Sequence, residues 1–330
     1  MTGSIPALGR GASCAVVAEV RFGLGIPVGT HPMPQWIQSA DAIAAVSRTA
    51  TASGFDHVFV SDPPAPPRQC LRGGGHDTFD PFVALTAVAL ADPEIGLLTN
   101  LLPLAYRHPL VLAKAAASLD TLAGGRLTLG VGVGYLRSEF AALDVPFDER
   151  NTRFDAALHA LGRLWADGSV EVVAGGDRVD EVVPLPAAPR GRIPIWIGGN
   201  AARTRQRVVD HAQGWMPMPN PAAYARTVRS PVLEGPDDLA VMLLDLRRRA
   251  NQAERSEPIE VVFVVGEGGN PAPRDFRPRE HLDALGAYAE IGVTGNNVTI
   301  DGRDLSETLD RVAAYGATVI EVFAQRGERR

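Results

Sequence analysis

Short apolar runs of strand-like composition alternate with longer stretches of helical periodicity from Arg21 to the end of the chain. Each strand candidate is followed by a stretch long enough for a helix, and eight such cycles can be read. The strand candidates span residues 21–28, 57–61, 95–102, 127–131, 193–197, 214–218, 259–265 and 296–300. Alternation of this kind is typical of β-α units that build a parallel sheet covered by helices. It places the chain in the α/β class.

The helical stretches carry start and stop signals. Asp80 can cap a helix and Pro81 suits its first turn, while Gly54 ends the helix predicted over 35–53. Further helices are predicted over residues 201–212, 235–254, 279–291 and 305–315. A helix over 109–123 is expected to bury Val111, Leu112, Ala115, Leu119 and Leu122. A helix over 151–166 is expected to bury Phe154, Ala157, Leu158, Leu161, Leu164 and Trp165.

Eight β-α cycles indicate a (β/α)8 TIM barrel with loop insertions, a fold that takes about 250 residues or more. We therefore expect one barrel domain over residues 21–330, preceded by a flexible extension over 1–20. Residues 168–192 are rich in glycine and proline and are expected to form an excursion off the barrel. A doubly wound sheet is the alternative, weakened because no Gly-x-Gly-x-x-Gly follows the first strand candidate.

Composition excludes several classes of function. With 45% hydrophobic residues, a net charge of −6 and no apolar run of about 18 residues, the sequence predicts a folded, cytoplasmic protein without a membrane span. Of the 32 basic residues only Lys114 is lysine. We interpret the arginine excess as codon bias, because the arginines are spread along the chain and 38 acidic residues outnumber them. A nucleic-acid partner is not expected.

The two cysteines, Cys14 and Cys70, provide neither a disulfide framework nor a metal cluster, which suits a reducing compartment. The sequence contains no His-Glu-x-x-His, Cys-x-x-Cys or Gly-x-Ser-x-Gly pattern. It predicts neither a metal site nor an acyl-transfer serine.

Glycines follow two of the strand candidates, at the end of the barrel where active sites are built. Gly130, Gly132 and Gly134 alternate after the fourth strand and let backbone approach a ligand closely. Gly198 and Gly199 follow the fifth strand and open a helix, whose free N–H groups and dipole attract an anion such as phosphate. Tight packing is the alternative explanation for the three alternating glycines, while Gly198 and Gly199 predict a phosphate subsite.

The chain resembles the luciferase-like monooxygenase superfamily and, within it, the oxidoreductases that depend on the deazaflavin coenzyme F420. The matching segments keep their order over about residues 21–220. They are GFDHVFVSD at 54–62, DPFVAL at 80–85, RHP at 107–109, LDTLAGGRL at 119–127, GVGVGYLRSEF at 130–140, VPF at 145–147, IPIWIGGN at 193–200 and GWM at 214–216. The resemblance is specific for the superfamily and much less so for the flavin and the substrate.

The resemblance implies a cofactor site with particular residues. A non-proline cis peptide that backs the flavin ring in relatives matches Asn100 and Leu101. The remaining cofactor positions implied by the resemblance are Asp62, Val133, Gly134, Tyr135, Ser138, Gly198, Gly199, Ala201, Ala202 and Met218. Tyr135 stands where some relatives carry a glutamate acid.

The chain departs from its relatives after the second strand, where they often read Asp-His and this chain reads Asp62-Pro63. The usual imidazole is absent. General acid or base assistance is worth roughly 10² to 10⁴ in rate, so another group must supply it if the chemistry needs it. The candidates are Asp62, at the end of a strand, and the loop residues His31 and His76.

The resemblance implies that the chain is a homodimeric enzyme that moves a hydride between coenzyme F420 and a small organic substrate. A monooxygenase that uses flavin mononucleotide (FMN), reduced by a partner flavin reductase, shares every motif and is the first alternative. The second alternative is a flavin-binding barrel that has lost catalysis, as the missing histidine allows.

Overall fold

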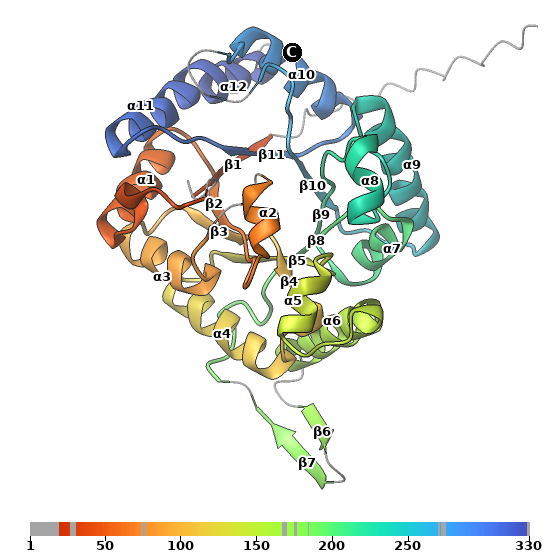
Figure 1. Cartoon of the computed structure of the whole chain (residues 1–330). Helices are drawn as coiled ribbons and strands as arrows, with labels where there is room; N and C mark the ends of the chain where they lie inside the picture. Colours follow the sequence, from red (N-terminus) through yellow and green to blue (C-terminus); the bar gives the residue numbers. More distant parts are fainter. Residues whose placement is uncertain are drawn as a thin grey trace, which may run out of the picture.

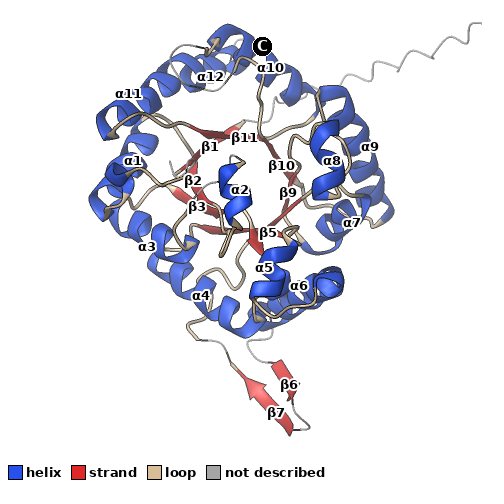
Figure 2. Ribbon diagram, in the orientation of Figure 1, coloured by secondary structure: helices blue, strands red, loops and turns tan. Residues whose placement is uncertain are grey.

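Eight parallel strands close into a barrel in the computed structural model, and Figure 2 looks along its axis. The structure describes residues 20–26, 31–73, 75, 77–166, 170–174, 177–183, 185–269, 271 and 275–328. The barrel strands are β1 (Arg21–Gly25), β2 (His57–Val60), β3 (Gly96–Thr99), β5 (Leu127–Gly132), β8 (Ile195–Gly198), β9 (Gly214–Met216), β10 (Glu260–Phe263) and β11 (Gly295–Thr299). Pairing of β3 with β5 closes the ring, which an open doubly wound sheet lacks.

Eight long helices surround the barrel (Figure 1). They are α1 (Ala40–Ala52), α3 (Pro81–Ala91), α4 (Pro109–Leu122), α6 (Arg150–Ala166), α7 (Ala202–His211), α9 (Pro236–Gln252), α10 (Pro278–Ile291) and α11 (Leu305–Tyr315). The predicted (β/α)8 barrel is confirmed. The prediction that Asp80 caps a helix is also correct, since its carboxylate accepts hydrogen bonds from the N–H groups of Phe82 and Val83. Gly54 ends α1 with φ at +82°.

The strand predicted over 95–102 is two strands. It breaks at a cis peptide bond between Asn100 and Leu101, so that β3 ends at Thr99 and the short β4 (Leu102–Pro103) pairs with the end of β5. The backbone therefore bulges at the end of β3, where the resemblance places the wall behind a flavin ring.

The insertions contain regular elements that the sequence did not predict. These are α2 (Arg68–Arg72), α5 (Arg137–Ala142), α8 (Ala222–Val228), α12 (Glu321–Glu328) and the antiparallel pair β6 (Val170–Ala174) and β7 (Asp177–Val182). The pair β6–β7 projects away from the barrel in Figure 1, as expected of an excursion over 168–192. The predicted extension over 1–20 lies outside the described residues except for Val20.

The buried face of α4 differs from the prediction. Val111 is 68% exposed and Leu122 is 59% exposed, whereas Leu112 and Leu119 are buried as expected. The buried stripe of α4 is completed by small residues, namely Ala113, Ala116 and Ala117. The predicted face thus includes two exposed residues and leaves out these three alanines. On α6 the predicted buried side is correct apart from Trp165, which is half-buried.

A small apolar cluster fills the barrel and is separate from the larger core between strands and helices. It comprises Leu98, Trp196, Met216 and Val262, with Phe59 and Leu101 packed against it. The barrel is thus solid, and a ligand must bind at one of its ends. Among the described residues, no helix is both long and apolar enough to cross a membrane.

Candidate functional site

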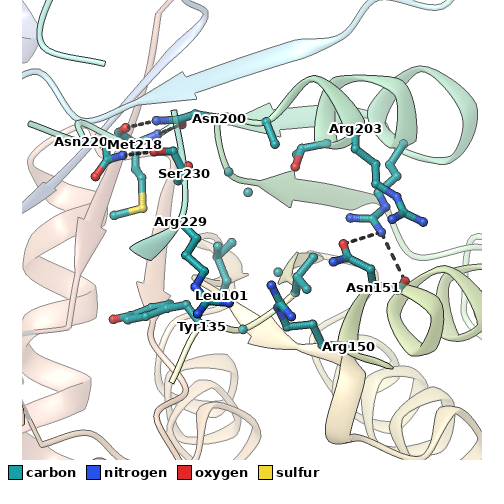
Figure 3. A pocket seen from close by; sticks show the side chains of 18 of the residues that line it. Leu101, Tyr135, Arg150, Asn151, Asn200, Arg203, Met218, Asn220, Arg229 and Ser230 are labelled. Atoms are coloured by element: carbon teal, nitrogen blue, oxygen red, sulfur yellow. Dashed lines mark hydrogen bonds between the residues drawn. The ribbon is translucent and has the colours of Figure 1, made fainter. Parts of the chain in front are cut away.

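A cavity of about 400 Å³ opens at the end of the barrel where the parallel strands end (Figure 3). Its walls come from segments far apart in the sequence, because the loops after β3, β5, β8 and β9 meet there. The lining residues are Leu101, Gly132, Val133, Gly134, Tyr135, Phe147, Arg150, Asn151, Gly198, Gly199, Asn200, Ala201, Arg203, Thr204, Arg207, Met218, Asn220, Arg229 and Ser230.

Glycines frame Leu101 on one wall of this cavity. A Cβ atom on Gly198 would overlap Leu101 Cδ1, and one on Gly132 would lie 3.2 Å from the same atom. A Cβ on Gly130 would overlap the Thr99 carbonyl. The bulge after β3 therefore fits only because β5 and β8 carry glycine opposite it. These glycines are required by packing as well as by ligand access.

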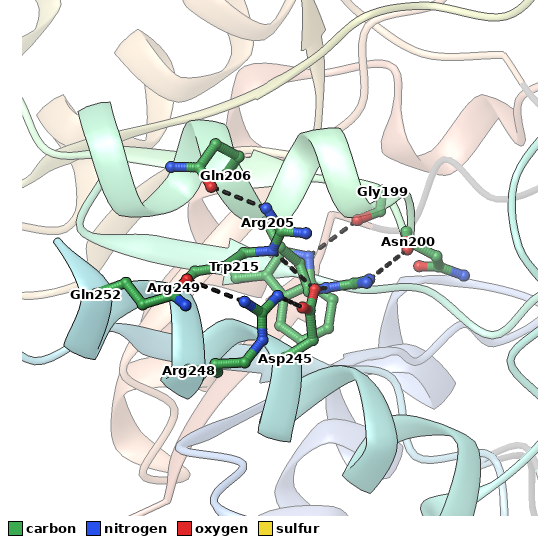
Figure 4. A network of polar contacts seen from close by, with 9 residues as sticks. All are labelled: Gly199, Asn200, Arg205, Gln206, Trp215, Asp245, Arg248, Arg249 and Gln252. Carbon is green, nitrogen blue, oxygen red and sulfur yellow. Dashed lines mark hydrogen bonds and ion pairs between the residues drawn. The ribbon is translucent and has the colours of Figure 1, made fainter.

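Hydrogen bonds hold the carbonyl groups of the turn between β8 and α7 (Figure 4). Trp215 Nε1 donates to the Gly199 carbonyl at 2.9 Å, and Arg205 Nη1 donates to the Asn200 carbonyl at 2.7 Å. The Asn200 side chain is also held, since its Nδ2 donates to the Met218 carbonyl. Gly199 adopts φ +114°, which favours glycine. The turn is fixed before any ligand binds.

The start of α7 is free to bind an anion. Its N-cap residue, Ala201, has no side chain that could accept a hydrogen bond from the first N–H groups. By contrast, α1 and α3 are capped by Ser39 and Asp80. Unpaired N–H groups at a helix start carry partial positive charge. Since Ala201 and Thr204 line the cavity, this helix start faces it.

Four arginines add positive charge to the same cavity. Arg203 and Arg207 share the carboxylate of Asp155, at 2.8 Å and 2.6 Å, so one of these two charges is unbalanced. Arg150 and Arg229 also line the cavity, and its lining residues include no aspartate or glutamate. The site is therefore built for an anionic ligand. Arginines that are distant in sequence therefore converge at this cavity.

Eight of the predicted cofactor residues line the cavity: Leu101, Val133, Gly134, Tyr135, Gly198, Gly199, Ala201 and Met218. Four others, including Asp62, do not. Asn100 lies behind Leu101 at the cis bond, while Ser138 and Ala202 are exposed first-turn residues of α5 and α7. Sequence reasoning missed all four arginines, and also Asn151 and Asn220, because no local motif marks them.

Asp62 is buried at the same end of the barrel but lies outside the lining of the cavity. Its carboxylate forms an ion pair with Arg107 at 2.6 Å. Burial raises the pKa of Asp62 to about 6, and the Arg107 charge opposes that rise. The neighbouring Glu139 is also buried, and burial together with the charge of Asp62 raises its pKa. Two carboxylates of raised pKa thus lie close together beneath the loop that contains α2.

Neither of the two histidines predicted as a possible acid or base, His31 and His76, is placed in the cavity by the described structure. His31 is exposed and its Nδ1 lies 2.6 Å from Asp77 Oδ1, while the other oxygen of Asp77 accepts a hydrogen bond from Met33 N–H. This contact ties the loop after β1 to the loop before α3. His76 lies outside the described residues. Among the described residues, no group of three or more His, Cys, Asp or Glu side chains could hold a metal ion.

Two curated relatives are similar to part of the chain. The F420-dependent glucose-6-phosphate dehydrogenase of Beutenbergia cavernae is 38% identical over 162 residues, which cover 45% of this chain and 47% of that protein. The F420-dependent hydroxymycolic acid dehydrogenase of Mycobacterium tuberculosis is 29% identical, over 53% of this chain and 48% of that protein. The chain thus spans about half the length of these two relatives.

A crystal structure of a monooxygenase from Streptomyces bottropensis has the same barrel fold. It aligns with a TM-score of 0.73 and 20% identity, over 92% of this chain and all of that chain. The sequence model described as luciferase-like monooxygenase matches residues 20–263, which is well over half of the chain. The chain therefore belongs to the luciferase-like monooxygenase family, a family of oxidoreductases and monooxygenases.

Proposed function

We propose that the chain is an oxidoreductase that uses coenzyme F420 to move a hydride to or from a small organic substrate. The proposal rests on one observation, which is that the two ends of the cavity differ in chemistry. One end combines the uncapped start of α7 with arginines, which suits an anionic tail, and the other presents Leu101 within a glycine frame, which suits a flat ring. The two relatives named as F420-dependent dehydrogenases support the choice of cofactor.

The residues that line the cavity fit coenzyme F420. The N–H groups at the start of α7, with Gly198 and Gly199 beside them, would hold a phosphate. Leu101 and Val133 would support the ring, with Tyr135 and Met218 at its edges. When bound, the deazaflavin supplies hydride transfer, and the protein supplies orientation and electrostatics. Gly199 and Asn200 hold their positions through Trp215 and Arg205 and therefore preorganise the phosphate end.

Asp62 is the group that we propose as proton carrier. A general acid or base works best with a pKa near the working pH, and the pKa of Asp62 is raised to about 6. Arg107 orients the carboxylate through Nε and Nη2, which both donate to the same Asp62 oxygen. His31 is held by Asp77 at the surface and in this proposal positions its loop rather than moving a proton.

Binding of the two flavin types tests the proposal. The purified protein is titrated with F420 and with FMN, and quenching of cofactor fluorescence is followed. We expect F420 to bind more tightly than FMN. Binding of FMN alone would overturn the choice of cofactor in favour of the monooxygenase with a partner reductase, and binding of neither would favour a barrel that has lost catalysis.

We also propose that the protein is a homodimer joined through α3 and α4. Helix α3 contains no charged residue, and Val83 and Leu90 on it are 68% and 73% exposed. Val111 and Leu122 of the neighbouring α4 extend this apolar face. A helix that is apolar all round is normally buried, and large exposed apolar patches mark interaction sites. A second copy of the same face is the symmetric partner that would cover it.

A further inference from the structure

Three arginines crowd around one aromatic ring at the edge of the cavity. The Cζ atoms of Arg137 and Arg150 lie 4.1 Å and 4.0 Å from the centre of the Phe147 ring, and that of Arg229 lies 6.0 Å away. Guanidinium groups stack favourably on aromatic faces. Like charges gathered at one place nevertheless repel one another, so the arrangement needs negative charge nearby.

The protein itself supplies little of that charge. Arg137 pairs with Asp148 at 3.2 Å, and Asp148 is largely exposed. Within the described part of the chain, neither Arg150 nor Arg229 has a carboxylate within ion-pair distance, and Arg150 instead donates to the Phe147 carbonyl. Burial and the charge of Arg229 lower the pKa of Arg150, and the charge of Asp148 opposes them. One exposed carboxylate, that of Asp148, thus stands against three arginines at this ring.

Arg229 has an uncommon backbone conformation. It ends α8 with φ at +52°, in the left-handed region that non-glycine residues rarely occupy. The next residue, Ser230, also lines the cavity. Arg150 and Arg229 both lie against the Phe147 ring. Arg203 and Arg207 instead share Asp155, and Figure 3 shows Arg203 apart from Arg229. The cavity thus has two cationic regions.

We propose that Arg150 and Arg229 form a second anion-binding subsite, distinct from the start of α7, which takes a carboxylate or phosphate group from the same bound molecule. The inference rests on the proposed function and sharpens it. FMN carries a single phosphate, which the start of α7 would hold alone. Coenzyme F420 carries carboxylates beyond its phosphodiester, so it can fill both regions. The cavity therefore selects a cofactor whose tail bears several negative groups.

The test compares two deazaflavins on three proteins. One ligand is F420, and the other is its deazaflavin precursor without phosphate or carboxylates. The proteins are the wild type, the double variant Arg150→Gln/Arg229→Gln, and Arg226→Gln, an exposed control on the same helix as Arg229. We expect the double variant to bind F420 about 3- to 30-fold more weakly and the precursor unchanged, since each exposed ion pair is worth up to about fivefold. The control should match the wild type.

Equal weakening of both ligands, or unchanged F420 binding, would overturn the subsite while leaving the proposed function intact. A second measurement does not need the cofactor. We expect inorganic pyrophosphate to raise the melting temperature of the wild type more than that of Arg229→Gln. If F420 fails to bind the wild type but this difference remains, the proposed function fails and the anion subsite stands. An equal rise in both proteins would contradict the subsite.

Discussion

Leu101 and the glycines around it decide whether a flat ring can reach the barrel end. A Cβ on Gly198 would overlap the Leu101 side chain, which lines the cavity. We expect Gly198→Ala to push Leu101 out of place and to weaken F420 binding at least tenfold, which is about 1.4 kcal/mol, while the far-ultraviolet circular dichroism spectrum stays unchanged. Fluorescence titration measures the affinity.

Gly162→Ala is the matched control, because a Cβ at this position of α6 would meet nothing within 4 Å. In a helix interior this change should add about 0.5 to 1 kcal/mol of stability and leave F420 affinity as it is. If both alanine variants bind F420 like the wild type, Leu101 does not form the wall behind the ring.

Asp62 gives the protein a defined pH dependence. Its pKa is raised to about 6 in the folded state, so the folded chain keeps a proton that the unfolded chain releases near pH 4. The contribution of Asp62 to the free energy of unfolding therefore falls as pH rises from about 4 to about 6. In Asp62→Asn, which cannot titrate, we expect this fall to be smaller by about 1 to 3 kcal/mol.

Urea unfolding of the wild type and Asp62→Asn at several pH values from 4 to 7 measures the difference. Asp283→Asn, a change on the exposed face of α10, should follow the wild type. Parallel stability curves for the wild type and Asp62→Asn would show that Asp62 is ionised throughout and would weaken its role as a proton carrier.

At the scale of elements, the packing of α7 against α9 fixes the phosphate end of the cavity. Asp245 on α9 accepts hydrogen bonds from Arg205, Arg248 and Arg249, and Arg205 also holds the Asn200 carbonyl (Figure 4). These arginines hold the pKa of Asp245 well below its usual range, against the opposing effect of burial. The turn at this end of the cavity is thus supported by charged side chains that do not line the cavity.

We expect Asp245→Asn to lower the free energy of unfolding by about 1 to 3 kcal/mol at pH 7 and to weaken F420 binding several-fold. Because the pKa of Asp245 is lowered, its stabilisation is present above about pH 4 and is lost as pH falls further. The stability difference should therefore shrink at pH 3. Asp210→Asn on α7 is the control, because this carboxylate accepts a hydrogen bond from Gln206 Nε2 on its own helix. An Asp245→Asn protein that binds F420 normally would contradict the positioning role.

The elements of the barrel could be predicted because each carries its own periodicity and capping signals, as Asp80 and Gly54 show. The full buried face of α4 could not be predicted, because alanines fill it beside Leu112 and Leu119 while the large Val111 and Leu122 are exposed. The glycines of the site could be predicted from their place after strands. The arginines of the site could not be predicted from the sequence, because Arg150, Arg207 and Arg229 come from three separate segments. Only the closed barrel brings these segments together.

At the scale of the whole molecule, the apolar face of α3 and α4 predicts how two copies associate. We expect the double change Leu90→Asp/Val111→Asp to convert a dimer to a monomer in sedimentation velocity, because burying the new charges would be costly. Val241→Asp/Leu244→Asp on α9 replaces side chains of similar exposure and should leave the dimer intact. A wild type that sediments as a monomer, or an α9 variant that dissociates equally, would contradict this interface.

The central claim is that one cavity at the end of the barrel binds F420 with its phosphate at α7 and its ring at the bulge after β3. A crystal structure of the F420 complex tests it most directly. We predict the phosphate within hydrogen-bond distance of the first N–H groups of α7 and the ring against Leu101. Cofactor bound outside this cavity, or with its phosphate away from Gly199 and Ala201, would contradict the claim.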